Sequence, residues 1–168
     1  MLKCIFLDRD GVINLDTNYA YKFSDIIWNK HIFKIIKFLK KNKIKICVVT
    51  NQSGIARGYF TEKDVKILHK KMNRYIFNKI GYKIDQFKYC PFLTNAKIKK
   101  YKKNSDDRKP NPGMINSYIK KKKLEKKNCI MIGDKRSDYL CGKKAGIKSF
   151  QIKNKNFLNL IKKEINNS

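Results

Sequence analysis

The chain has 168 residues, enough for one domain with a buried core, and its hydrophobic content of 42% argues against wholesale disorder. Its longest apolar runs are only a few residues long, which excludes membrane spans and predicts a cytoplasmic protein with no membrane partner. The net charge is +28, yet five of the 41 basic residues are arginine, and the lysines line nearly every segment. This pattern favours compositional bias over a dedicated nucleic-acid surface.

Short β-rich runs alternate with longer helical patterns along the chain. We expect five strands, at 3–7, 45–49, 86–90, 129–132 and 148–152. We expect five helices, at 31–42, at 61–80 with Thr61 as its N-cap, at 112–123, around 140–141 and at 158–165. This alternation predicts an α/β fold: a three-layer, Rossmann-like parallel sheet forming a single domain over residues 1–168. The five cysteines are scattered, mostly in apolar segments, and are expected to be free buried thiols.

Polar residues follow three of these strands, and ligands of such sheets bind at the carboxyl ends of the strands. Asp8 and Asp10 follow the first strand, and Asp134 follows the fourth. Three carboxylates at one edge form an oxygen-rich site suited to Mg²⁺. The alternative interpretation is that they are turn and cap residues, but "TNQSG" at the second strand end makes independent turns a poorer explanation.

The stretch "SDDRKPNPGM" begins in a long polar loop at 91–111 and ends in the first residues of the helix expected from 112. Taken alone, its Arg108 and Lys109 are more typical of a solvated surface. A site of three carboxylates, however, needs fixed positive charge to hold a phosphate dianion, and Lys109 beside a proline can supply it. Arg108 can bind a second phosphate through its forked guanidinium.

Four segments together carry a family resemblance: "FLDRDGVIN", "VVTNQSGIARGYFT", "DDRKPNPGM" and "MIGDKRSDYLCGKKAG". They resemble, in order, the motifs of the haloacid dehalogenase superfamily of phosphatases. More narrowly, the likeness is to its heptose-bisphosphate phosphatase family, with histidinol-phosphate phosphatases as close relatives. The resemblance covers residues 2–146 and implies a Mg²⁺-dependent phosphatase without a large cap domain, because the segments at 14–32 and 92–107 are too short for one.

The resemblance also implies roles for individual residues. Asp8 would be the nucleophile that forms an aspartyl-phosphate, and Asp10 the general acid and base, with Arg9 pointing elsewhere. Thr50 and Lys109 would stabilise the transferring phosphoryl group. Mg²⁺ would be held by the Asp8 carboxylate, the Asp10 backbone carbonyl and the Asp134 carboxylate, with Asp138 supporting its water shell or capping the next helix.

The substrate would be a small phosphorylated sugar, with heptose 1,7-bisphosphate as the best match, used in making the heptose of lipopolysaccharide. The resemblance assigns substrate contacts to nine residues: Asp16, Thr17, Asn18, Tyr19, Asn51, Gln52, Ser53, Arg108 and Lys135. The enzyme is expected to be a monomer. Two other functions stay open: a histidinol-phosphate phosphatase, and a basic nucleic-acid-binding protein on the same scaffold, motivated by the charge.

The sequence departs from the family at a zinc-binding loop that many relatives carry. Cys90 is present, but Phe92, Ser105 and Asp107 stand where the other ligands would be. Because structural zinc needs four nitrogen or sulfur ligands, we expect no zinc and a Cys90 that serves in packing. The loop is then expected to be held by Asp106 or Asp107 pairing with lysines, or to be more mobile. Tyr21 also replaces a frequent histidine, and His31 and His69 are assigned no chemistry.

Overall fold

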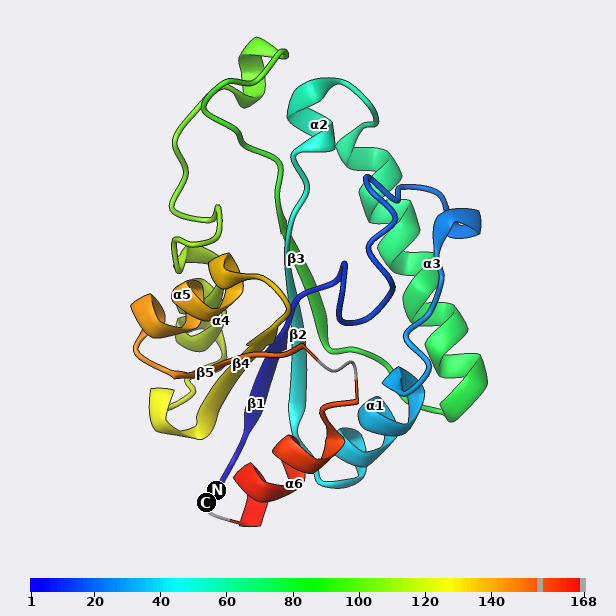
Figure 1. Ribbon diagram of the computed structural model, residues 1–168, viewed down its shortest axis with the longest axis vertical. Helices are drawn as coiled ribbons and strands as arrows, with labels where there is room; N and C mark the ends of the chain where they lie inside the picture. Colours follow the sequence, from blue (N-terminus) through cyan, green and yellow to red (C-terminus); the bar gives the residue numbers. More distant parts are fainter. Residues whose placement is uncertain (154–155, 167–168) are drawn as a thin grey trace.

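The computed structural model describes residues 1–153 and 156–166, in which five parallel strands form one sheet (Figure 1). The strand order is β3-β2-β1-β4-β5. The strands are β1 (Cys4–Leu7), β2 (Lys45–Asn51), β3 (Gln86–Cys90), β4 (Cys129–Gly133) and β5 (Lys148–Gln151). All four strand pairings are parallel, as the alternating sequence pattern predicts.

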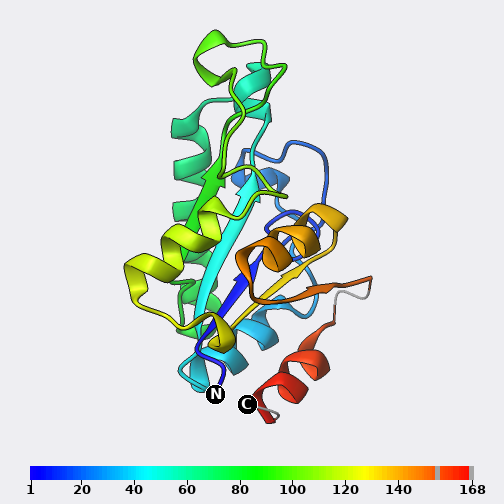
Figure 2. The same ribbon diagram turned by 90° about the vertical axis from the view of Figure 1, so that its left-hand side faces the viewer.

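Helices cover both faces of the sheet, so the expected three layers are confirmed (Figures 1 and 2). One face is covered by α1 (Ile32–Lys41), α3 (Glu62–Ile80) and α6 (Leu158–Asn166). The other is covered by α4 (Gly113–Lys122) and α5 (Arg136–Ala145). Side chains of β1 alternate between two hydrophobic cores, one on each face of the sheet. Ile5 and Leu7 pack in the core under α1, α3 and α6, whereas Cys4 and Phe6 pack in the core under α4 and α5.

Local signals in the sequence explain where the helices begin and end. Thr61 caps α3: its hydroxyl accepts from the Asp64 N–H, and the Asp64 carboxylate accepts from the Thr61 N–H. The pattern missed α2 (Gly54–Arg57), a single turn too short to show periodicity. β2 also runs two residues further than expected, so Thr50 and Asn51 are part of the strand rather than of the turn after it.

Two long segments at the carboxyl ends of the strands contain no inserted cap in the described chain. Between β1 and α1 there is one 3-10 turn, Phe23–Asp25, and between β3 and α4 another, Lys99–Tyr101. The second segment lies beside α2, where the Ile98 N–H donates to the Ala56 carbonyl at 3.0 Å (Figure 2).

Among residues 1–153 and 156–166, no helix combines the length and apolarity needed to cross a bilayer.

Candidate functional site

A cavity of about 400 Å³ opens at the carboxyl ends of the strands and collects nearly all the residues singled out from the sequence. The predicted residues in its wall are Asp8, Asp10, Asp16, Asn18, Tyr19, Thr50, Asn51, Gln52, Ser53, Arg108, Lys109 and Lys135. Thr17 is exposed and is not part of the wall. Ser137, which sequence reasoning missed, does line it, and its position inside "GDKRSD" was the available signal.

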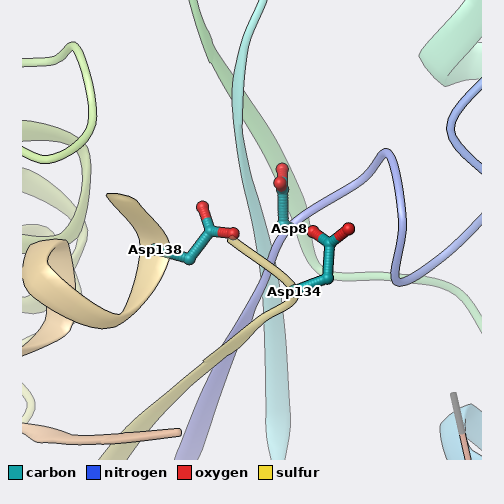
Figure 3. Close-up of side chains that lie close together, drawn as sticks. All are labelled: Asp8, Asp134 and Asp138. Atoms are coloured by element: carbon teal, nitrogen blue, oxygen red, sulfur yellow. The ribbon is translucent and has the colours of Figure 1, made fainter. Parts of the chain in front are cut away.

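Three carboxylates lie close together at the cavity, where Asp8 and Asp138 line the wall and Asp134 does not (Figure 3). Oxygen atoms of Asp8, Asp134 and Asp138 lie within 4.8 Å of one another. Glycines permit this approach: a Cβ on Gly11 would overlap the Asp134 carboxylate, and one on Gly133 would overlap the Asp138 side chain. An all-oxygen donor set of this kind fits Mg²⁺.

Asp138 has a larger part in the site than the sequence indicated. Its Oδ2 accepts from the Lys135 N–H at 3.0 Å, which confirms the expected cap of α5. Its Oδ1 lies 2.7 Å from the Lys109 Nζ, and the residue is fully buried. Asp138 therefore joins the helix cap, the carboxylate cluster and the buried ammonium in one place.

Lys109 lies between two of the three carboxylates. Its Nζ is 2.8 Å from Asp8 Oδ1 and 2.7 Å from Asp138 Oδ1, and the residue is 4% exposed. Burial alone would lower the pKa of Lys109, but the two carboxylates outweigh burial and raise it, so the ammonium stays charged. Burial raises the pKa of Asp8 to about 7, although Lys109 opposes this rise. A cation bound here would further favour the ionised form of Asp8.

Asn51 fixes the backbone that carries Lys109. Its Nδ2 donates to the Lys109 carbonyl, and its Oδ1 accepts from the Lys109 N–H, both at 3.0 Å. The resemblance assigned a substrate contact to Asn51, which lines the cavity. Its amide makes this pair of hydrogen bonds, which ties the 91–112 segment to the end of β2, and its contact with substrate stays a prediction.

Arg9 does not point away from the carboxylates, contrary to our expectation. Its guanidinium forms a two-pronged contact with the Asp10 carboxylate, and the nearer pair, Nη2 to Oδ2, is 2.9 Å apart. Gln52 donates to the same Asp10 oxygen at 3.2 Å and to the Thr50 hydroxyl at 3.0 Å. The Asp10 carboxylate thus lies at the cavity wall but is held outside the cluster formed by Asp8, Asp134 and Asp138.

The rim of the cavity is formed by charged and aromatic side chains from separate segments. The Lys135 Nζ lies 2.8 Å from Asp16 Oδ2, which joins two loops 119 residues apart in sequence. Tyr19, with a left-handed backbone at φ 58°, packs edge-on against Tyr59. Arg108 donates to the Phe92 carbonyl at 3.1 Å and also lines the cavity.

The loop that presents Arg108 is held by Glu62 of α3 and by aromatic packing. Glu62 accepts from the Tyr89 hydroxyl at 2.8 Å and from the Tyr101 hydroxyl at 2.9 Å. Tyr101 also packs in a cluster with Leu93, Phe60 and other apolar residues. The expected pairing of Asp106 or Asp107 with lysine is wrong for the described residues, whose ion pairs do not include either aspartate.

Two of the four positions linked to zinc in the resemblance are buried in the structure. Cys90 is fully buried and packs in the core beneath α4, as expected of a packing residue, and Ser105 is 6% exposed. Across residues 1–153 and 156–166, the cluster of Asp8, Asp134 and Asp138 is the one group of three or more possible metal ligands. The absence of zinc stays a prediction.

Comparisons with known proteins agree with the geometry. A family model described as HAD-hydrolase-like matches residues 107–157. The chain is 36% identical over 147 residues to D-glycero-beta-D-manno-heptose-1,7-bisphosphate 7-phosphatase of Helicobacter pylori, covering 88% of this chain and 81% of that protein. It is 37% identical to D-glycero-alpha-D-manno-heptose-1,7-bisphosphate 7-phosphatase of Photorhabdus laumondii, covering 87% and 79%.

A solved structure shares the fold over almost the whole chain. It is the D,D-heptose 1,7-bisphosphate phosphatase from B. bronchiseptica complexed with magnesium and phosphate, with a TM-score of 0.81 and 26% identity. The similarity covers 96% of this chain and 87% of that one. A metal and a phosphate are therefore bound by a protein with this architecture.

Gly11→Ala is expected to weaken Mg²⁺ binding by about tenfold or more, because the new Cβ displaces the Asp134 carboxylate. Gly81→Ala is the matched control: both glycines have positive φ, 91° and 73°, but nothing lies within 4 Å of a Cβ at Gly81. Calorimetric titration of both variants with Mg²⁺ measures the difference, and thermal denaturation reports the shared backbone strain. Equal Mg²⁺ affinities in the two variants would contradict this account.

Tyr101→Phe is expected to open the loop that presents Arg108, because it removes one hydroxyl bond to Glu62 and keeps the ring. The variant should lose about 1 kcal/mol of local stability, which raises the population of the open loop. Tryptic cleavage after the exposed lysines at 97–103 should therefore be roughly fivefold faster. Tyr89→Phe is the control, since it removes the other bond to Glu62 from a strand and not from the loop. Peptide mapping of timed digests gives the rates, and equal rates for the two variants would refute the role of Tyr101.

Proposed function

Because the chain belongs to the D-glycero-D-manno-heptose-1,7-bisphosphate 7-phosphatase family of HAD-like hydrolases, we propose that it removes the 7-phosphate of this sugar bisphosphate. The observation that carries the proposal is the buried ammonium of Lys109 between Asp8 and Asp138, at the floor of a cavity rimmed by Arg108 and Lys135. The two relatives act, by their names, on different anomers, and the proposal covers both.

Asp8 is the nucleophile of the proposed reaction. Its Oδ1 accepts from the Arg9 N–H at 2.7 Å and pairs with Lys109, so the carboxylate is held in one orientation. An oxygen of Asp8 attacks phosphorus, the bond from phosphorus to the sugar oxygen breaks, and an aspartyl-phosphate forms. Lys109 and the Thr50 hydroxyl, both at the cavity wall, stabilise the charge on the transferring group.

Asp10 handles the protons in both steps. In its protonated form, in which one oxygen no longer accepts the hydrogen bond from Asn14 or Gln52, it gives a proton to the departing sugar oxygen, which leaves as an alcohol. It then takes a proton from water while the water oxygen attacks phosphorus, which releases phosphate and restores the Asp8 carboxylate. The hydrogen bonds from Gln52 and Arg9 set the orientation in which Asp10 does this.

The metal proposed here is Mg²⁺, which would be held by the carboxylates of Asp8 and Asp134 together with the Asp10 backbone carbonyl. Its chemistry is to neutralise charge, so that a carboxylate can approach a phosphate. The structural neighbour that carries magnesium and phosphate supports this assignment. No zinc is proposed, because Phe92, Ser105 and Asp107 leave Cys90 without enough partners for a structural site.

Recognition of the remaining phosphate is assigned to the positive rim of the cavity. Arg108 and Lys135 lie in its wall, and Lys135 would exchange its ion pair with Asp16 for a substrate oxygen. Asn18, Tyr19 and Ser53 would contact the sugar from the other segments of the wall.

We place the enzyme in the cytoplasm, as a monomer, in the synthesis of the heptose of lipopolysaccharide.

Turnover of a substrate panel tests the proposal. Heptose 1,7-bisphosphate should lose its 7-phosphate in the presence of Mg²⁺, with loss of rate on chelation, and histidinol phosphate should be a poor substrate. Phosphate release gives the rate, and phosphorus NMR of the product identifies which ester was cleaved. Preferred cleavage of histidinol phosphate, or of the 1-phosphate, would show that the substrate assignment is wrong.

Asp8→Asn should lower kcat on the same substrate by about a thousandfold or more, because an amide is not a nucleophile toward phosphorus. Asp25→Asn is the matched control: Asp25 is a capping residue outside the cavity wall and should keep the wild-type rate. A rate close to wild type for Asp8→Asn would contradict the covalent mechanism.

A further inference from the structure

Arg9 is a fully buried arginine, and each of its three guanidinium nitrogens has a hydrogen-bond partner. Nε and Nη2 contact the two Asp10 oxygens at 3.1 and 2.9 Å, and Nη2 also donates to the Ala20 carbonyl at 2.9 Å. The third nitrogen, Nη1, lies 3.4 Å from Nε2 of His69. His69 is on α3, 60 residues away in sequence, and the motifs of the active site do not include it.

His69 can only be an acceptor in this contact, because a guanidinium has donors and no acceptor. The Nε2 atom must therefore carry a lone pair, and the proton of the neutral ring resides on Nδ1. The ring is 6% exposed and is stacked on Phe87 with centroids 4.7 Å apart. Burial, with the charge of Arg9 as a second cause, lowers the pKa of His69 to about 3, which agrees with a neutral ring.

The Asp10 carboxylate has little rotational freedom in this arrangement. Each of its oxygens accepts one hydrogen bond from Arg9 and a second from another side chain. The second donors are Asn14 Nδ2 to Oδ1 at 2.9 Å and Gln52 Nε2 to Oδ2 at 3.2 Å. The two-pronged contact with the Arg9 guanidinium fixes the plane of the Asp10 carboxylate. The contacts with His69 and with the Ala20 carbonyl in turn fix the orientation of the guanidinium.

We propose that His69 and Arg9 are positioning residues for Asp10, with His69 acting through the arginine. The proposal rests on the proposed function, in which Asp10 protonates the departing sugar oxygen. Proton transfer requires the carboxylate within hydrogen-bond reach of that oxygen, and small misplacements cost large factors in rate. A fixed guanidinium fork keeps the carboxylate at the cavity wall while substrate enters.

Two substitutions separate hydrogen bonding from packing at position 69. His69→Phe keeps a ring against Phe87 and removes the acceptor, whereas His69→Gln keeps an acceptor oxygen and removes the ring. The positioning role predicts that His69→Phe is impaired and that His69→Gln retains most of the activity. A purely structural role predicts the reverse order, with the glutamine variant the weaker one and the lower in melting temperature.

Comparing substrates with different leaving groups distinguishes the positioning role from a loss of packing, which would lower kcat/KM equally on both. With p-nitrophenyl phosphate the departing phenolate needs no proton, so kcat/KM of His69→Phe should stay within about twofold of wild type. With heptose 1,7-bisphosphate the same variant should lose about tenfold in kcat/KM, since Asp10 is no longer oriented toward the alkoxide. Equal losses on the two substrates, or no loss on either, would overturn the proposal.

A measurement without turnover separates this inference from the proposed function. Nitrogen-15 NMR of the histidine rings in the wild-type protein should show His69 as the neutral Nδ1–H tautomer at neutral pH. Finding the Nε2–H tautomer would overturn the proposal even in an active enzyme. Inactivity of the wild type on both phosphate esters, with the Nδ1–H tautomer present, would count against the proposed function and leave the Arg9 contact established.

Discussion

The site depends on one buried ammonium. Asp8 and Asp138 are both buried, and two carboxylates removed from water at close range repel one another unless positive charge lies between them. Lys109 supplies that charge at 2.8 and 2.7 Å, and it comes from a long segment with little regular structure. The position of this segment therefore matters as much to the site as the strands do.

The rest of the structure places that segment. Asn51, at the end of β2, binds the backbone of Lys109 through two hydrogen bonds, and Glu62, at the start of α3, accepts from Tyr101 in the loop. Both anchors are parts of regular elements whose other faces are buried in the cores. The order of the sheet, with β1 between β2 and β4, brings Asp8 next to Thr50 on one side and Asp134 on the other. The residue that follows β4 supplies the carboxylate of Asp134, and helix α5 supplies that of Asp138.

Much of this could be predicted from the sequence, for physical reasons. The segment 129–132 is an apolar run with a clear end, and the rule for parallel sheets then places Asp8, Thr50 and Asp134 at one edge. These rules do not predict contacts between individual side chains, because they locate elements and strand ends and not side-chain orientations. Arg9 was expected to point elsewhere, yet it is folded onto Asp10, and Glu62 has a structural role that no local pattern encodes. The short helix α2 was missed because one turn carries no period.

The central claim is that Asp8, held by Lys109, becomes covalently phosphorylated. The most direct test is rapid acid quenching of the Asp10→Asn variant during reaction with p-nitrophenyl phosphate, whose leaving group needs no proton from Asp10, followed by mass spectrometry of its peptides. Loss of the general base should slow hydrolysis of the intermediate, so the account predicts a phosphoryl group on the peptide that contains Asp8. A variant that still consumes substrate, with that peptide unmodified at every time point, would contradict it.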